Sequence, residues 1–435
     1  MKKIAASVGI IALGASALHA AETSTLNSMQ QTKAWSVSAS LRGFYDDNVA
    51  AQANKTDSVG VQISPSVNFG IAGEQTSFNV GYDFTARYYD KQAPGRTDKS
   101  DYTHAFNADL SHAFSPRLDI LASESFVIGQ EPDLLRDPAS TQPIDGDNIR
   151  NFASVELNVA ATQLLGFSFG YNNSYYDYAD EVVFFAPPTV VTAASNSGLY
   201  DRMEHLLRFD SRWKLSPQTT GIIGYNYGQA GYNGDQPIAG DTTIAPGLPG
   251  GVVLSDFRDS RTHTFYVGAE HDFNNTLSGL VKIGAQHTDY FNDPSGESQW
   301  SPYIEGSLRY MYQTTSSIDI GIRHNRTAGN DAGGAGATFV RDMASTTVYG
   351  SIRHALAAKL FVTGNATIQQ STYNAPGSVI DDQSFLFYQL GLDLSYEFNP
   401  NLSAHIGYNY DQLDSDLVGR DYERNRVYLG LTAGF

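Results

Sequence analysis

The sequence predicts an all-β protein, namely a transmembrane, antiparallel, up-and-down β-barrel of about 18 strands. Three observations predict this fold. Apolar and polar residues alternate in successive segments, as they do in strands with one apolar face. The connections between these segments are alternately short and long. The chain ends on an apolar strand, which would invite aggregation at the open edge of a soluble sheet but closes a barrel inside a membrane.

The last strand supplies the most specific of these signals. Its alternate residues are apolar and its final residue is aromatic. This ending resembles the C-terminal signal that the barrel-assembly machinery reads in bacterial outer-membrane barrels, so that machinery is an expected partner. The alternative is an ordinary last strand of a soluble β-protein. The predicted assembly signal consists of Val427, Leu429, Leu431, Ala433 and Phe435.

The beginning of the chain predicts export through the Sec pathway. Residues 1–21 combine Lys2 and Lys3 with an apolar run and small residues, which is the pattern of a signal peptide. The run is too short to span a bilayer as a helix. Residues 22–33 are expected to form a short periplasmic segment, and residues 34–435 the barrel. The sequence has no cysteine, which excludes a lipoprotein anchor and disulfide bonds.

The composition favours β-structure and opposes nucleic-acid binding. The chain of 435 residues contains 26 Tyr, 23 Phe and 40 Gly, and residues of the aromatic type are enriched in strands. The formal net charge of −18 opposes binding to nucleic-acid phosphates. After the signal peptide, no stretch is apolar for long enough to form a membrane helix. Barrel strands need no such stretch, because only one of their faces is apolar.

The expected strands follow one another from Trp35 onward. The second spans residues 59–71 with its apolar residues at alternate positions, and the third begins at Phe78. Short turns are expected at 73–75, 115–117, 162–163, 216–218, 274–275, 313–315, 357–359 and 399–401. A polar run at 46–48 follows the first strand, and long connections are expected at 90–100, 130–148, 179–201, 233–260, 292–298, 328–342, 374–382 and 414–420. Short turns are predicted to face the periplasm and long loops the cell exterior.

Aromatic residues are expected to form two rings at the two ends of the strands, where the water–lipid interfaces favour them. The strand middles are expected to carry mainly aliphatic residues and glycine. The ring near the short turns comprises Phe69, Phe114, Trp213, Phe273, Tyr310, Tyr312, Tyr396 and Phe398. The ring near the long loops comprises Tyr45, Tyr88, Tyr89, Tyr175, Tyr176, Tyr225, Tyr227, Tyr290, Phe291, Tyr408 and Tyr410.

The polar series opposite the apolar one is expected to line the lumen. It carries charges of both signs side by side, and a barrel with this number of strands is wide enough to leave an aqueous channel. A lumen that is plugged, with charges that merely pair, is the alternative. The predicted pore-lining residues are Arg42, Asp83, Arg87, Asp109, Glu156, Arg208, Asp210, Arg212, Lys282, Glu305, Arg309, Asp319, Arg323, Arg353, Asp393 and Arg426.

These features predict passive diffusion of small hydrophilic solutes across an outer membrane. Two alternatives stay open: an exopolysaccharide export pore, and a surface adhesin or structural barrel with a blocked lumen. Acidic residues of the long loops are expected to be solvated, to bridge divalent cations to lipopolysaccharide, or to set a cation preference. The apolar loop 182–194 is expected to pack on other loops, with a constriction or a partner contact as alternatives. Oligomeric state is not predicted.

No motif for catalysis or for a cofactor stands out, so the sequence predicts no enzyme and no cofactor. The glycine-rich stretch 333–336 lacks the Lys-Ser/Thr of a phosphate loop and is expected in an outer loop. His112, His271 and His354 are expected at the membrane interface and not in a metal site. Glu124 falls on the apolar face of its strand, which indicates either a β-bulge or a carboxyl group that faces lipid.

Two short motifs resemble a known family. Phe44-Tyr45-Asp46-Asp47-Asn48 follows the first strand, and Phe114-Ser115-Pro116-Arg117-Leu118 forms a turn between strands. In both, the chain is similar to the outer-membrane β-barrel porin 2 family, whose members are large bacterial barrels, some encoded beside exopolysaccharide-synthesis genes. The resemblance implies a porin-type barrel over the mature chain and, less directly, a role in polysaccharide export. It supplies no catalytic residues.

Overall fold

The computed structural model describes residues 34–92, 98–129, 147–179, 184–185, 189–232, 234, 236–246, 250–293, 296–328, 340–375, 378, 380–417 and 419–435. The predicted signal peptide, the segment 22–33 and the glycine-rich stretch 333–336 lie outside these residues. No helix in the described part of the chain is long and apolar enough to cross a membrane.

Eighteen long strands of the described chain form one closed antiparallel sheet. Each long strand pairs with the next long strand along the chain, and the last one, β22, pairs with β1. The strands are β1(Trp35–Asp46), β2(Ser58–Ala72), β3(Thr76–Tyr89), β4(Ser100–Ser115), β5(Leu118–Gly129), β6(Asn148–Val159), β7(Leu165–Tyr178), β10(Arg202–Lys214), β11(Thr219–Tyr232), β14(Ser260–Asp272), β15(Leu277–Tyr290), β16(Ser298–Gln313), β17(Ser316–Ala328), β18(Asp342–Ala357), β19(Leu360–Asn374), β20(Ser384–Asn399), β21(Leu402–Ser415) and β22(Tyr422–Gly434). The predicted fold class and strand number are confirmed.

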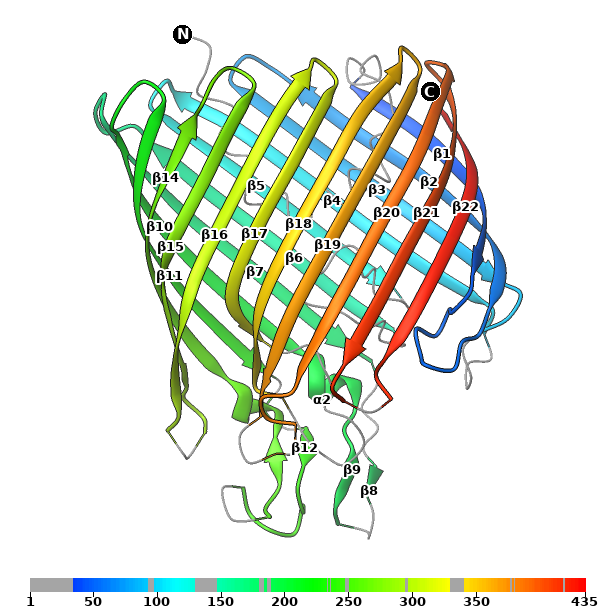
Figure 1. Ribbon diagram of the computed structural model, residues 1–435, viewed down its shortest axis with the longest axis vertical. Coiled ribbons are helices and arrows are strands. Elements are labelled where there is room, and N and C mark those ends of the chain that lie inside the picture. Colours follow the sequence, from blue (N-terminus) through cyan, green and yellow to red (C-terminus); the bar gives the residue numbers. More distant parts are fainter. Residues whose placement is uncertain are drawn as a thin grey trace.

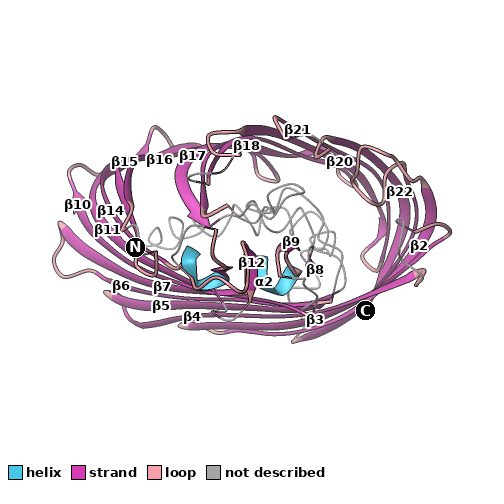
Figure 2. Cartoon of the chain, turned by 90° about the horizontal axis from the view of Figure 1, so that it is seen from below, coloured by secondary structure: helices cyan, strands magenta, loops and turns pink. Residues whose placement is uncertain are grey.

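The strands are tilted along the wall, and the barrel has an elongated cross-section (Figures 1 and 2). Short turns lie at one end, here called the short-turn end, together with the C-terminus (Figure 1). The long connections lie at the other, the long-loop end. Two of them contain further elements: β8(Phe184–Phe185), β9(Val191–Ala193) and α2(Asn196–Tyr200), then β12(Pro237–Ala239), β13(Val253–Leu254) and the 3₁₀ helix η2(Ser255–Arg258).

The first and last strands close the barrel. Their register runs from Ser38 opposite Gly434 to Asp46 opposite Arg426. At the short-turn end, the Phe435 N–H donates to the Val37 carbonyl at 2.9 Å, and the Val37 N–H donates to the Phe435 carbonyl at 3.2 Å. The strand that ends the chain therefore has no open edge along this register, which removes the aggregation hazard of an unpaired apolar strand.

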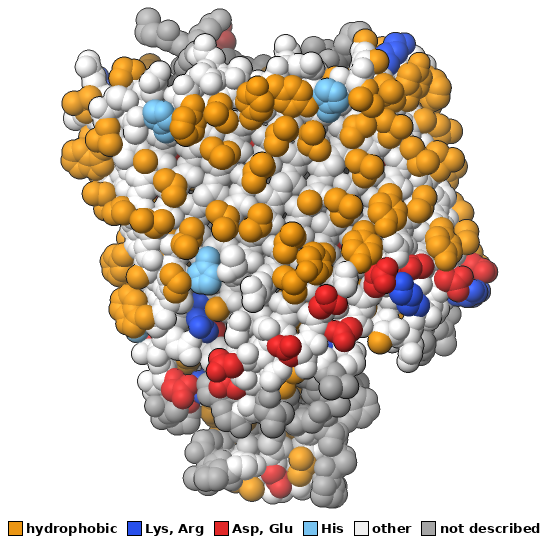
Figure 3. Space-filling model, in the orientation of Figure 1, with side chains coloured by type: hydrophobic (Ala, Val, Ile, Leu, Met, Phe, Trp, Pro, Cys, Tyr) orange, Lys and Arg blue, Asp and Glu red, His pale blue; other side chains and the backbone are white. Residues whose placement is uncertain are grey.

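The outer wall is apolar. Alternate residues of each strand point outward, and aliphatic side chains among them are largely exposed, for example Leu429 at 64% and Val59 at 58%. Figure 3 shows these hydrophobic side chains covering the wall, while charged side chains on this face gather toward the long-loop end. Such a surface is stable only when lipid covers it. The alternation of apolar and polar residues in the sequence therefore corresponds to the outer and inner sides of the barrel wall.

The predicted aromatic rings need a correction. Tyr88 is exposed on the outer wall, but Tyr89, Tyr176 and Tyr290 are buried on the inner side. Consecutive residues of a strand point to opposite faces, so both members of an adjacent aromatic pair cannot join the outer ring. The strand middles also carry outward aromatic residues as well as aliphatic ones, as shown by the exposed Phe106.

Glu124 faces outward without a bulge. The register of β5 is continuous around it, with Glu124 opposite Ala108 of β4 and Ala153 of β6. The exposed Ile128 lies four residues further along the same strand and therefore on the same face. Of the two interpretations, a flipped register is wrong, and Glu124 is a carboxyl group on the lipid-facing wall.

Candidate functional site

The structure places all sixteen predicted pore-lining residues on the inner face of the barrel. Each one alternates in its strand with outward residues, as Arg309 alternates with the exposed Leu308 and Tyr310. Asp109 and Arg353 are exposed although they point inward, so solvent reaches the lumen at these positions. The inner wall is therefore polar and hydrated, as expected for the inside of a wide barrel.

Most of these charges are brought together in pairs by strand register. Arg309 of β16 lies opposite Asp319 of β17, and its Nε donates to the carboxylate at 2.7 Å. Arg208 donates to Glu156 at 3.4 Å, and Arg212 forms an ion pair with Glu270. The side chains of Arg309 and Asp319 keep 32% and 29% of their surface accessible. The pairs neutralise one another while they stay in contact with solvent.

A second group surrounds Lys282 of β15. Its Nζ lies 3.9 Å from Asp210 and 3.6 Å from Glu305, which come from β10 and β16. The ammonium group also lies 5.0 Å from the centre of the Tyr266 ring. The Tyr266 hydroxyl donates to Asp210 at 2.5 Å, and the Tyr303 hydroxyl donates to Glu305 at 2.9 Å. One ammonium group is thus shared by two carboxylates that tyrosine hydroxyls hold in place.

Near the closing strands, a third group includes residues that the charge pattern does not predict. Arg426 donates to Asp411 at 2.8 Å, and Arg42 donates from Nε to His405 Nε2 at 3.0 Å. The guanidinium carbon of Arg42 lies 4.9 Å from the centre of the Tyr428 ring. This wall therefore combines ion pairing with aromatic contacts.

Two predicted lining residues have no carboxylate within ion-pair distance in the described part of the chain, namely Arg323 and Arg353. Arg323 lies opposite Glu305 in the register, but Glu305 contacts Lys282 instead. Arg353 lies with its guanidinium carbon 5.4 Å from the centre of the Phe361 ring. Both arginines leave positive charge on the lumen wall that is not neutralised by direct contact.

Lumen-facing tyrosines lie flat across glycines of the neighbouring strand. Tyr266 covers Gly224, and Tyr349 covers Gly321. A Cβ atom at either glycine would overlap the ring, so only glycine lets the ring lie along the wall. The sequence shows the glycines and the tyrosines, but only the register shows that they are opposite each other.

Two hydrophobic clusters lie at the long-loop end. The first joins α2 and β12 to β7: Leu199, Tyr200 and Ile238 pack on Tyr176 and Tyr178. The fully buried Arg258 of η2 donates to the carbonyl groups of Leu199 and Gly198 at 2.8 and 2.7 Å. Figure 2 shows α2, β8, β9 and β12 within the outline of the barrel. These contacts join the two long connections that contain regular structure, β7–β10 and β11–β14, to one another at the long-loop end.

The predicted packing of loop 182–194 on other loops is confirmed for its described residues. The Val191 N–H donates to the Gly240 carbonyl at 2.9 Å, and Val190 forms a bridge with Asp241. Val191 is fully buried. Residues 182–183 and 186–188 of this loop lie outside the described residues.

The second cluster covers the opposite side of the mouth, over β18 to β22. It contains side chains from four connections and from the inner face of these strands, and Arg420 donates to the Tyr373 hydroxyl at 2.7 Å beside it. Its members are Ala51, Val340, Met343, Tyr373, Ala375, Ile380, Phe385, Phe387, Leu413, Leu417 and Tyr422.

Burial also shifts the pKa of two side chains at the long-loop end, Asp259 and Arg258. Desolvation raises the pKa of Asp259 to about 6, and the charge of Asp256 adds to this effect. The carboxylate accepts the Tyr232 N–H at 2.7 Å and the Asn292 side-chain amide at 2.9 Å. Desolvation lowers the pKa of the buried Arg258 guanidinium. Asp259 is therefore a group at the mouth that titrates near neutral pH.

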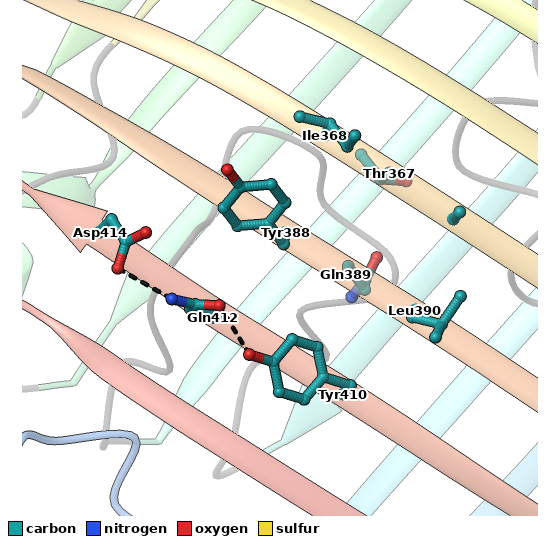
Figure 4. A pocket seen from close by; sticks show the side chains of 9 residues that line it. Thr367, Ile368, Tyr388, Gln389, Leu390, Tyr410, Gln412 and Asp414 are labelled. Atoms are coloured by element: carbon teal, nitrogen blue, oxygen red, sulfur yellow. Dashed lines mark hydrogen bonds between the residues drawn. The ribbon is translucent and has the colours of Figure 1, made fainter.

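A groove of about 390 Å³ lies on the outer wall across β19, β20 and β21, and it is separate from the lumen (Figure 4). Its base includes the exposed Ile368 and Leu390. Along one side, the Tyr410 hydroxyl donates to Gln412 at 2.6 Å, and the Gln412 amide donates to Asp414 at 2.9 Å. This groove faces the surroundings of the barrel and takes no part in lining the channel.

The histidines expected at the interface lie on the outer wall. His112 and His271 contact the hydroxyl groups of Thr76 and Thr219 at 2.7 and 2.9 Å. His354 contacts the Tyr312 hydroxyl at 2.8 Å. Each therefore has a hydrogen-bond partner on the adjacent or next strand, in the ring near the short turns.

A closed antiparallel barrel with an apolar outer wall and a polar inner wall defines an outer-membrane channel of the porin class. The family model described as "Putative beta-barrel porin 2" matches residues 36–435, and the chain belongs to this family. The family resemblance predicted from the two short motifs is thereby confirmed. No curated protein matches the chain in a comparison of sequences.

Matches among solved structures include proteins of two bacteria. Pseudomonas aeruginosa OpdK, in a structure with vanillate, is 11% identical, with 92% of this chain and 99% of that chain covered and a TM-score of 0.43. Pseudomonas aeruginosa OccK9 (OpdG) is 13% identical, with 92% and 98% covered and a TM-score of 0.44. Acinetobacter baumannii OccAB4 is 9% identical, with 93% and 99% covered and a TM-score of 0.43.

Proposed function

We propose that this porin-family barrel forms a water-filled channel for passive diffusion of small hydrophilic solutes. The observation that carries the proposal is the state of the inner charges: Arg309 and Asp319 pair at 2.7 Å yet remain about one-third exposed. A lumen collapsed onto its own salt bridges would bury such a pair. Neutralised, hydrated walls let a solute exchange water for wall contacts at little cost in free energy.

We also propose an orientation for the barrel in the membrane and the partners that it meets there. Short turns face the periplasm and long connections the cell exterior, as in single-chain bacterial barrels whose termini share the periplasmic side. The chain reaches the outer membrane by Sec export and by the barrel-assembly machinery. Lipid and lipopolysaccharide cover the apolar wall, and acidic groups of the long-loop end bind divalent cations between them.

Planar-bilayer recording of the purified mature chain tests the proposal. Stable single-channel steps are expected, together with size-limited swelling of liposomes in sugars of increasing mass. A barrel that is inserted and heat-modifiable but gives no steps would overturn the proposal and favour an adhesin or structural role. Loss of extracellular polysaccharide on deletion, with solute uptake unchanged, would instead favour an export pore.

A further inference from the structure

The groove across β19, β20 and β21, here called the outer groove, lies on the lipid-facing side of the wall. Its volume of about 390 Å³ falls within the range of about 300–1,000 Å³ that is usual for sites that bind small molecules. Leu390, which lines it, is 46% exposed, whereas the next residue, Gly391, is buried on the inner face. A molecule that occupies the outer groove therefore comes from the membrane and not from the channel.

The floor of the outer groove is apolar. Ala366 of β19 lies between Gly350 of β18 and Leu390 of β20, and Ile368 lies opposite Tyr388. Ala366 and Gly350 have little or no side chain, so the wall is low beside the larger Ile368 and Leu390. Both of these larger side chains are nearly half exposed. Such a hollow in a surface that faces the membrane is filled by hydrocarbon.

The rim of the outer groove, toward the long loops, is polar. On β21, the Tyr410 hydroxyl donates to Gln412 at 2.6 Å, and the Gln412 amide donates to Asp414 at 2.9 Å (Figure 4). One amide hydrogen of Gln412 and one carboxylate oxygen of Asp414 have no partner among the described residues. On β20, the half-buried Tyr388 also makes no side-chain hydrogen bond within the described part of the chain. The rim thus offers both donors and acceptors to a ligand.

The chemistry of the rim favours a saccharide over a phosphate. None of the residues that line the outer groove is cationic. Lys55 lies beyond the next strand, where it pairs with Asp47 at 3.0 Å and Glu423 at 3.8 Å. Proteins bind phosphate mainly through Arg, Lys or backbone N–H groups, and the Asp414 carboxylate would repel it. Hydroxyl and amide groups of a saccharide can instead donate to the carboxylate and accept from the side-chain amide.

We propose that the outer groove binds one lipopolysaccharide molecule of the outer leaflet. An acyl chain lies over Ala366 and Ile368, and saccharide groups form hydrogen bonds with Gln412 and Asp414. A lipid with a saccharide head matches both the floor and the rim, whereas a phospholipid matches the floor alone. This inference rests on the proposed orientation of the long-loop end toward the cell exterior. It turns a general contact between the wall and lipopolysaccharide into one defined site.

Native mass spectrometry of the detergent-solubilised barrel tests this site. A rough lipopolysaccharide is titrated in the presence of excess phosphatidylglycerol, and we expect one saturable molecule per barrel. Equal retention of phosphatidylglycerol, or uptake of lipopolysaccharide without saturation, would overturn the proposal. Binding should persist in EDTA, because the contacts are hydrogen bonds. Loss of binding in EDTA would indicate a divalent cation between carboxylate and phosphate and would contradict the saccharide contact.

Variants of the floor and of the rim test the two parts separately. Ala366→Trp fills the floor and Gln412→Ala removes the centre of the rim, and we expect each to weaken binding about tenfold. Matched controls make the same changes elsewhere on the outer wall. Ala39→Trp alters an exposed alanine of β1, and Gln229→Ala removes an amide of β11 that accepts from the Tyr227 hydroxyl at 3.2 Å. The controls should bind like the wild type, and equal weakening in all four would refute the site.

Two comparisons keep the result interpretable. Heat-modifiability identifies folded barrels, and Gln412→Ala tests the site independently if Ala366→Trp does not fold. Binding in detergent does not depend on orientation, so single-channel recording of the wild-type barrel separates the two proposals. Channel steps without saturable lipopolysaccharide binding would remove the groove site and leave the diffusion channel standing. Saturable binding without steps would support the groove site and remove the channel.

Discussion

Asp46 and Arg424 form a buried ion pair that joins the first strand to the last across 378 positions of the sequence. The guanidinium donates to the carboxylate from Nε at 2.9 Å and from its terminal nitrogen at 2.8 Å. The other carboxylate oxygen of Asp46 accepts the Asn48 N–H at 2.9 Å. Asp47 accepts the Asn425 N–H at 2.6 Å. The family motif that contains these residues therefore fastens the barrel closure at the long-loop end.

Removal of the arginine of this pair is expected to destabilise the closed barrel. Arg424→Gln leaves the Asp46 carboxylate buried without its cation, and loss of one partner of a buried ion pair costs about 3–5 kcal/mol. The temperature at which the heat-modifiable barrel unfolds in detergent measures the effect. Lys91→Gln removes a pair with Asp57 in which both side chains are more than half exposed, so it should change little. Equal effects of the two variants would contradict the assignment.

The terminal residue is expected to matter more for assembly than for stability. The Phe435 ring is 65% exposed, so Phe435→Ala removes little buried surface and keeps both backbone hydrogen bonds with Val37. Deletion of Phe435 removes the ring and the bonds. If the assembly machinery reads the ring, both variants should lower the yield of folded barrel in cells while Phe435→Ala refolds normally in detergent. A normal cellular yield from both would refute the assembly signal.

Charge removal at one lumen pair is expected to shift ion selectivity in opposite directions. Arg309→Gln leaves Asp319 uncompensated and should move the reversal potential toward cation preference. Asp319→Asn leaves Arg309 uncompensated and should move it toward anion preference. Reversal potentials in a salt gradient across a planar bilayer measure both. Shifts of the same sign, or none, would place this pair outside the conducting path.

The part of the long-loop end around Asp259 is expected to become less stable as pH rises. Because burial raises the pKa of Asp259 from 3.8 to about 6, the folded state favours the protonated carboxyl group. The stability from this preference is present below about pH 4 and is lost as pH rises toward about 6. Hydrogen exchange of the Asp259 amide, which donates to the Asp256 carbonyl at 2.9 Å, should speed up over this range in the wild-type protein after correction for intrinsic rate. In Asp259→Asn the protection should be flat with pH, and the Ile223 amide in the middle of β11 serves as the control.

Replacement of the outward-facing acid is expected to stabilise the barrel. Glu124 lies between Ala108 and Ala153 on the wall that meets lipid, where an acidic residue costs less than about 2 kcal/mol. Glu124→Leu should therefore raise the urea concentration that unfolds the barrel in phospholipid vesicles. Glu156→Leu is the matched control: it removes the partner of Arg208 in the lumen and should destabilise. Destabilisation by Glu124→Leu would indicate that Glu124 contacts a partner within the membrane.

The sequence by itself determined the fold class, the strand number, the faces of the strands and the family. These follow from a period of two, which is local: each residue's side of the wall is set by its neighbours in the chain. For the same reason, Arg309 and Asp319 could be assigned to the lumen separately. Their pairing could not be predicted, since it depends on the register between two strands.

Only the tertiary structure decided how these parts meet. It showed that Tyr290 belongs to a buried cluster and not to the outer ring, and that Glu124 faces lipid in an unbroken register. It also showed that the Gln286 side chain hydrogen-bonds to the backbone of Arg326, which has no register partner on β16 in the described chain. Each of these facts depends on strand shear and on loops that fold back from distant positions, and such long-range geometry leaves no period in the sequence.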